Sequence, residues 1–270
     1  MKKIFILLFM TIFSFYIIGN NLGNNKYLKN IKDLKEKYEV EPIDAIVKDN
    51  TIIPGKKGIK IDYQKSILAM KKYKSFNETL ILTKEDKPKI TINNQYNKYI
   101  EKGNEYNHQI SIVFKIEKDI KRIINVLNKK NIVGNFFIDE SLLEKEESLI
   151  KDNKKHSFNI LNNNSHNNEA LYKAYVFYLN SILKRKSNFC YTEKEDNEIL
   201  NNCSKLSMFT IKPLVIIKKD LLNNIKKFLS NSMIITIELN NDNERELSSS
   251  IDYILSKGYK IVSLEELIKE

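Results

Sequence analysis

The chain has 270 residues, of which 42% are hydrophobic and 29% are charged, with no Trp, seven Gly and four Pro. This length and composition suffice for one sizeable core with an appendage, and they exclude a disordered or fibrous chain. The net charge of +11 would favour a nucleic-acid partner if the chain were cytoplasmic.

The first 21 residues argue against a cytoplasmic location. Two lysines precede an unbroken apolar run at 4–18, which is shorter than the roughly 20 residues of a typical membrane span. No A-x-A-like cleavage site follows, so 1–21 is either a removed signal peptide or an uncleaved membrane anchor. Both alternatives predict an extracytoplasmic protein, secreted or membrane-anchored, and neither favours a nucleic-acid partner. The positive charge would then meet anionic wall polymers or lipid head groups, or simply remain solvated.

Two short regions follow the apolar run. Residues 22–37 are polar and Lys-rich, which indicates a spacer. Residues 38–105 contain short β-prone runs, turn signals and a helical pattern at 63–75, and they predict a small α+β region.

From 106 to the C-terminus, strand and helix patterns alternate. The expected strands are 110–114, 132–138, 157–161, 188–192, 208–211, 214–217 and 232–239. Alternation of this kind implies parallel pairing through helical crossovers. About seven units in roughly 160 residues favour a compact β/α barrel over an open doubly wound sheet.

In such a barrel, functional side chains follow the carboxyl ends of the strands. The groove candidates at these positions are Glu117, Asp139, Asn162, His166, Glu193 and Glu238. A hydrolytic metal site needs about three converging His or carboxylate ligands, yet His108 and His156 precede their strands and only His166 is well placed. From the residues alone, no active site can be recognised in the predicted barrel.

The two cysteines, Cys190 and Cys203, form no disulfide framework and match no metal spacing. They could pair in an oxidising compartment, but two free, partly buried thiols are the safer interpretation.

Six segments within about 109–268 follow one another in a characteristic order and spacing: VFKIE (113–117), GNFFIDE (134–140), KHSFNILNNNSH (155–166), FCYTEK (189–194), IITIE (234–238) and SKGYKIVSLEELI (256–268). In these segments the chain resembles the polysaccharide deacetylase family, the carbohydrate esterases of family 4 that share the NodB-homology domain. VFKIE matches the family's T-F-D-D-G, the last segment is the most specific match, and His156 falls on the family's first, structural histidine. The resemblance implies a compact, irregular (β/α) barrel of the glycoside hydrolase and deacetylase type.

The chain departs from the family pattern at the positions of the family's catalytic and metal-binding residues. Lys115 and Ile116 stand where the resemblance implies a catalytic base and a metal-binding Asp. The metal-binding histidine pair falls on Leu161 and Ser165, or on Asn162 and His166 with one inserted residue. Cys190 replaces an arginine, and Glu238 replaces the general-acid histidine. A lysine at this place would repel a divalent cation, so we expect neither metal nor catalysis.

Three functions are compatible with this pattern. The leading hypothesis is a catalytically inactive domain that binds a glycan, an anionic wall polymer or a protein partner. The second is a diverged deacetylase that uses Asp139, His166 and Glu238, with help from Glu117 and a divalent metal such as zinc. The third is a scaffold whose 38–105 region binds a partner. A fold alone does not choose among them.

Overall fold

The computed structural model describes residues 26–117, 120–161 and 168–270, and it divides into two compact units. The described part of the smaller unit is 26–43 and 57–89, and the larger unit is Asp44–Lys56 and Ile90–Glu270. The predicted signal or anchor at 1–21 lies outside the described residues. No helix within the described ranges is long and apolar enough to span a membrane.

The smaller unit packs short helices on a two-stranded sheet. Its elements are α2 (Leu28–Lys32), α3 (Lys35–Tyr38), β3 (Gly58–Ile61), α4 (Tyr63–Tyr73), the 3-10 turn η1 (Glu78–Leu80) and β4 (Thr83–Asp86). β3 and β4 pair antiparallel. Helix α4 was predicted at 63–75. Asp62 is its N-cap residue, and the Asp62 side chain accepts a hydrogen bond from the Lys65 N–H. Ile31, Ile67 and Met70 form the centre of its core.

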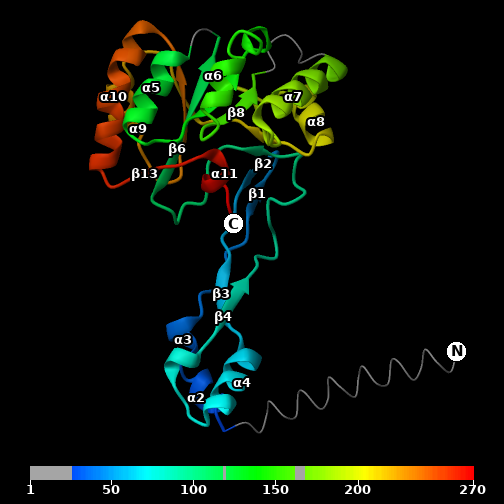
Figure 1. The fold of residues 1–270 in the computed structure, drawn as a ribbon, viewed down its shortest axis with the longest axis vertical. Helices are drawn as coiled ribbons and strands as arrows, with labels where there is room; N and C mark the ends of the chain where they lie inside the picture. Colours follow the sequence, from blue (N-terminus) through cyan, green and yellow to red (C-terminus); the bar gives the residue numbers. More distant parts are fainter. Residues whose placement is uncertain (1–25, 118–119, 162–167) are drawn as a thin grey trace, which may run out of the picture. The chain divides into compact units, whose positions relative to one another are not determined.

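The larger unit alternates strands and helices along the chain (Figure 1). Its strands are β1 (Ile46–Lys48), β2 (Thr51–Ile53), β5 (Tyr99–Ile100), β6 (Gln109–Ile116), β7 (Asn135–Ile138), β8 (Ser157–Ile160), β9 (Phe189–Tyr191), β10 (Phe209–Ile211), β11 (Val215–Ile217), β12 (Ile234–Glu238) and β13 (Lys260–Ile261). Its helices are α5 (Lys121–Lys129), η2 (Glu140–Leu142), α6 (Glu147–Asp152), α7 (Glu169–Leu183), α8 (Asn197–Lys205), α9 (Leu221–Phe228), α10 (Asn241–Ser256) and α11 (Leu264–Leu267).

The strands form an irregular (β/α) barrel, as the sequence predicts. One parallel sheet has the order β11-β12-β6-β7-β8, and β13 also pairs with β6. The other has the order β1-β2-β5-β10-β9 and is parallel from β2 to β9. β8 and β9 lie next to each other without forming a ladder, so the two sheets continue one another around the barrel.

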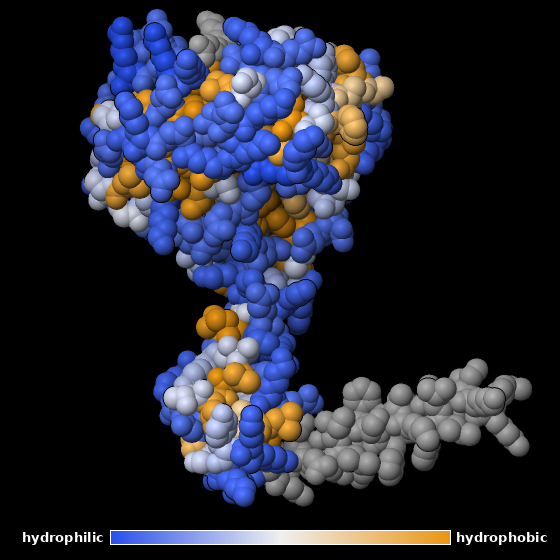
Figure 2. Space-filling model, viewed as in Figure 1, coloured by the Kyte–Doolittle hydropathy of each residue, from blue (hydrophilic) through white to orange (hydrophobic). Residues whose placement is uncertain are grey.

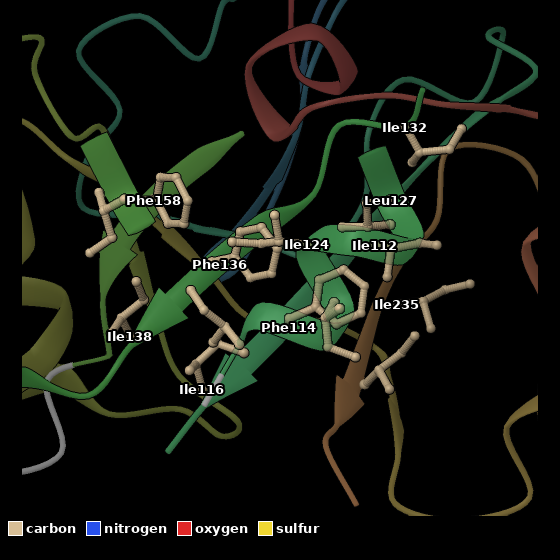
Figure 3. Close-up of a cluster of buried hydrophobic side chains, with 14 of the residues drawn as sticks. Ile112, Phe114, Ile116, Ile124, Leu127, Ile132, Phe136, Ile138, Phe158 and Ile235 are labelled. Carbon is tan, nitrogen blue, oxygen red and sulfur yellow. The ribbon is translucent and has the colours of Figure 1, made fainter. Parts of the chain in front are cut away.

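Alternate residues of each strand enter two different apolar cores, because successive side chains of a strand point to opposite faces. On β6, Phe114 and Ile116 pack with Ile124 and Leu127 of α5, on the side of the helices (Figure 3). Val113 belongs to the other core, inside the barrel, together with Phe137 of β7. Position 115 therefore faces the barrel interior and position 116 faces the helices.

The structure divides the predicted 38–105 region between the two units. Residues 44–56 and 90–105 belong to the larger unit because β5 pairs with β10 and with β2. These partners are about 110 and 47 residues away from β5, so local sequence patterns did not indicate the pairing. The half-buried carboxylate of Glu270 stabilises this arrangement by accepting hydrogen bonds from the backbone N–H groups of Gly55 and Ile92.

Candidate functional site

Lys115 stands at the carboxyl end of β6 and points into the barrel. Its Nζ atom lies 3.2 Å from Oε1 of Glu117 and 3.2 Å from Oε1 of Glu193, which follows β9. Its side chain is 22% exposed. Burial by itself lowers the pKa of Lys115, but the hydrogen bonds and negative charges of Glu193 and Glu117 outweigh it, so the pKa is raised above the ordinary lysine value. The ammonium group thus remains charged.

A second ion pair lies beside the first. Glu238 at the end of β12 is the ladder partner of Lys115, and its Oε1 atom lies 3.0 Å from Nζ of Lys218. The hydrogen bond and charge of Glu238, and then the charge of Glu193, raise the pKa of Lys218. The five side chains form one charge network, here named the rim cluster: Lys115, Glu117, Glu193, Lys218 and Glu238.

Two buried hydroxyl groups lie next to the rim cluster. Tyr191 on β9 is 4% exposed and Thr236 on β12 is fully buried, and among the described residues the two hydroxyls make at most a weak hydrogen bond, with each other. Burial raises the pKa of Tyr191, the weak hydrogen bond with Thr236 lowers it, and the charges of Glu193 and Glu238 raise it further. The Tyr191 hydroxyl therefore remains protonated and can both donate and accept a hydrogen bond.

Another lysine joins two glutamates at the strand ends of the second sheet. Nζ of Lys212, after β10, lies 2.8 Å from Oε1 of Glu101, after β5, and 3.2 Å from Oε1 of Glu195. The sequence did not single out this group, nor Tyr191, Thr236 and Lys218. Each depends on strands that are distant in the chain, so no local motif could have revealed them.

The remaining predicted site residues have other positions. Asp139 is buried at the N-terminus of η2, where its Oδ1 atom accepts a hydrogen bond of 3.0 Å from the Ser141 N–H. Ile116 lies in the helix-facing core. Asn162 and His166, the candidates from the family's histidine region, lie outside the described residues. The structure therefore brings together Glu117, Glu193 and Glu238 of the six groove candidates.

The described residues do not fit a divalent metal ion. They contain no group of three or more His, Cys, Asp or Glu side chains that could hold one. The positions implied as base and ligand carry an ammonium group and an apolar side chain, and the nearby carboxylates are already paired with lysines. No step of a metal-dependent reaction can be derived from this arrangement.

His156 has a structural role, as its sequence match implies. It is fully buried before β8, and its Nδ1 atom accepts the Gly134 N–H at 3.0 Å. Its Nε2 atom lies 3.0 Å from Oδ1 of Asn128. Nε2 therefore carries the proton and the ring is neutral. It fixes the loop before β7 at the end of the barrel opposite the rim cluster.

Cys190 and Cys203 form a disulfide, so the interpretation as two free thiols is wrong. Cys190 lies on β9 and Cys203 on α8, and both are fully buried. Helix α8 leads back along the barrel from β9 to β10, which brings the two Cα atoms to 6.3 Å. At the position where the family pattern has an arginine, this chain has a covalent link.

The fold is that of the family 4 carbohydrate esterases, in a degenerate form of the polysaccharide deacetylase domain. A pseudoenzyme of this family from Bacillus anthracis is 18% identical, with a TM-score of 0.68 over 92% of this chain and 96% of that one. A mutant of that protein with restored enzymatic activity has a TM-score of 0.69 at 18% identity, over 92% of this chain and 99% of the mutant. PdaA of Bacillus subtilis, a family 4 carbohydrate esterase, is 16% identical with a TM-score of 0.54, over 84% of this chain and 97% of PdaA.

No known family profile and no curated protein sequence matches the chain. At these identities the likeness to solved structures establishes the fold, whereas the activity has to be argued from the site.

Proposed function

We propose that this protein is a catalytically inactive member of the deacetylase fold that binds a cell-wall glycan outside the cytoplasm. The observation that carries the proposal is the Lys115 ammonium group, held between Glu117 and Glu193 where the family pattern has its catalytic base.

The rim cluster lacks the groups that deacetylation needs. Hydrolysis of an acetamide needs an activated water, a base to take its proton and an acid for the leaving amine. Lys115 is charged and cannot act as the base, and Glu238, in place of the acid histidine, is paired with Lys218. Because such groups act as a unit, the loss of several should abolish the reaction rather than reduce it.

The same groups suit a neutral, hydroxyl-rich ligand. Carboxylates accept and ammonium groups donate hydrogen bonds, and the Tyr191 and Thr236 hydroxyls make at most a weak hydrogen bond with each other, so they can bond to a ligand. Burying a hydroxyl without a partner is unfavourable, and a bound sugar hydroxyl or acetamide group would supply one. A similar solved structure is a peptidoglycan N-acetylglucosamine deacetylase, which supports an N-acetylated wall glycan as the ligand class.

Two features support a location outside the cytoplasm. The sequence predicts an export signal or anchor at 1–21. The Cys190–Cys203 disulfide is of a kind that persists in oxidising compartments.

The test is calorimetric titration of the purified full-length chain with chitotetraose, a tetramer of N-acetylglucosamine, combined with an assay for released acetate. The assay is repeated with added zinc, cobalt or manganese. We expect saturable binding without acetate release. Glu193→Gln should weaken binding, whereas Asp252→Asn, which breaks the Lys130 ion pair after α5, should leave it unchanged.

Other outcomes contradict the proposal. Metal-dependent acetate release that is lost in His166→Ala would establish the diverged enzyme. Absence of both binding and release would favour the protein-partner and scaffold hypotheses.

A further inference from the structure

A cavity of about 660 Å³ lies at the other end of the barrel from the rim cluster. The cavity is lined by the segment before β7, by Lys155 and the start of β8, by the loop before β9, and by the segment that joins β13 to α11. The volume is within the range of roughly 300–1,000 Å³ that is usual for small-molecule sites.

Three cationic side chains line this cavity. Lys155 precedes β8, and Arg185 and Lys186 lie between α7 and β9. Among the described residues, no carboxylate forms an ion pair with any of the three. The guanidinium group of Arg185 donates a hydrogen bond to the carbonyl oxygen of His156, which holds it beside the cavity. The cationic groups are therefore available to an anionic ligand.

The lining also includes two carboxylates, from the first turn of α11. Oγ of Ser157 donates a hydrogen bond of 3.2 Å to Oε1 of Glu265, and Glu266 also lines the cavity. The backbone here is anchored, because the Leu264 N–H donates to Oδ1 of the buried Asn135 at 2.8 Å. Neither glutamate forms an ion pair with the three cations in the described structure, so the cavity offers both donors and acceptors to a ligand.

We propose that this cavity binds an acidic sugar, meaning a carbohydrate that carries a carboxylate or phosphate group. The planar guanidinium group of Arg185 can bind either anion with two parallel hydrogen bonds, and Lys155 and Lys186 add positive charge. Glu265 and Glu266 can accept hydrogen bonds from the sugar hydroxyls. The proposal is independent of the rim cluster and of the glycan binding proposed there.

The test is calorimetric titration of the full-length chain with glucuronate, glucose 6-phosphate and glucose at low salt. We expect at least one of the two acidic sugars to bind saturably and neutral glucose not to bind. The stronger of the two acidic sugars identifies the anion as carboxylate or phosphate. The double variant Lys155→Ala, Lys186→Ala should weaken binding at least tenfold.

The matched control is the double variant Lys154→Ala, Lys184→Ala. It removes the same charge from exposed neighbouring positions that do not line the cavity. We expect it to bind as the unaltered chain does. The proposal is overturned if neither acidic sugar binds, if glucose binds equally well, or if both double variants lose affinity to the same degree.

Discussion

Nζ of Lys115 lies 3.2 Å from Oε1 of Glu193, and this ion pair joins the ends of two strands that belong to different sheets. β6 is central in one sheet and β9 is an edge strand of the other. The position at which the family pattern has a catalytic carboxylate thus carries an electrostatic link across the barrel. We therefore expect Lys115 to contribute to the stability of the barrel.

Lys115→Met should destabilise the protein by roughly 1–3 kcal/mol at neutral pH, between the usual values for exposed and buried ion pairs. Its loss leaves Glu117 and Glu193 without their shared counter-ion. Urea denaturation gives the free energy of unfolding. Lys130→Met is the matched control, because Lys130 is 20% exposed and its partner Asp252 is 64% exposed. We expect it to cost less than about 1 kcal/mol.

The pH dependence follows from the raised pKa of Lys115. A lysine whose pKa is raised on folding contributes stability that is fully present below the unfolded pKa, near 10.5, and is lost as the pH rises through the folded value. The difference between the unaltered chain and Lys115→Met should therefore be constant from pH 7 to 10 and become smaller above that. A difference that persists unchanged above the folded pKa would contradict this electrostatic role.

Tyr191→Phe should raise stability while it weakens glycan binding. The variant removes a buried hydroxyl that makes at most a weak hydrogen bond, with Thr236, so it should stabilise the free protein by up to about 1 kcal/mol. If a glycan supplies the missing hydrogen bond, the same change should weaken chitotetraose binding about tenfold. Urea denaturation and calorimetry measure the two effects. A loss of both stability and binding would indicate a purely structural hydroxyl.

The sequence predicted the strands after residue 106 well because each of them carries a local signal, whereas β1, β2 and β5 join the barrel through partners that are distant in the chain. The apolar runs at 110–114 and 132–138 became β6 and β7, and the terminal SKGYKIVSLEELI segment became β13 and α11. The contacts of the candidate site cross the barrel. The alignment with the family singled out Lys115, but its two carboxylate partners follow from how β6 and β9 face each other.

Removal of the disulfide should destabilise the larger unit. The bond closes a loop of 13 residues, for which the loss of unfolded-state entropy contributes about 3 kcal/mol. Urea denaturation with and without a phosphine reductant should show this difference. The double variant Cys190→Ala, Cys203→Ala should be insensitive to the reductant. Two thiols that react in the urea-denatured, unreduced chain would show that the disulfide does not form.

His156 should make the protein less stable in mild acid. Burial, and then the positive charge of Lys155, lower its pKa from 6.5 to about 4. Below pH 6.5 the unfolded chain therefore binds a proton that the folded chain does not, so the free energy of unfolding falls as the pH decreases to about 4. The shift of about 2.5 units corresponds to roughly 3 kcal/mol in total.

Nuclear magnetic resonance measures the pKa of His156 directly, and loss of its signal in His156→Gln assigns the resonance. We expect no titration between pH 8 and 5, because a proton on Nδ1 would displace the hydrogen bond from the Gly134 N–H. Lys155→Ala should raise the pKa by less than half of the total shift, since burial is the larger cause. A midpoint near 6.5 would show that His156 is solvated and that the loop before β7 is not fixed by its ring.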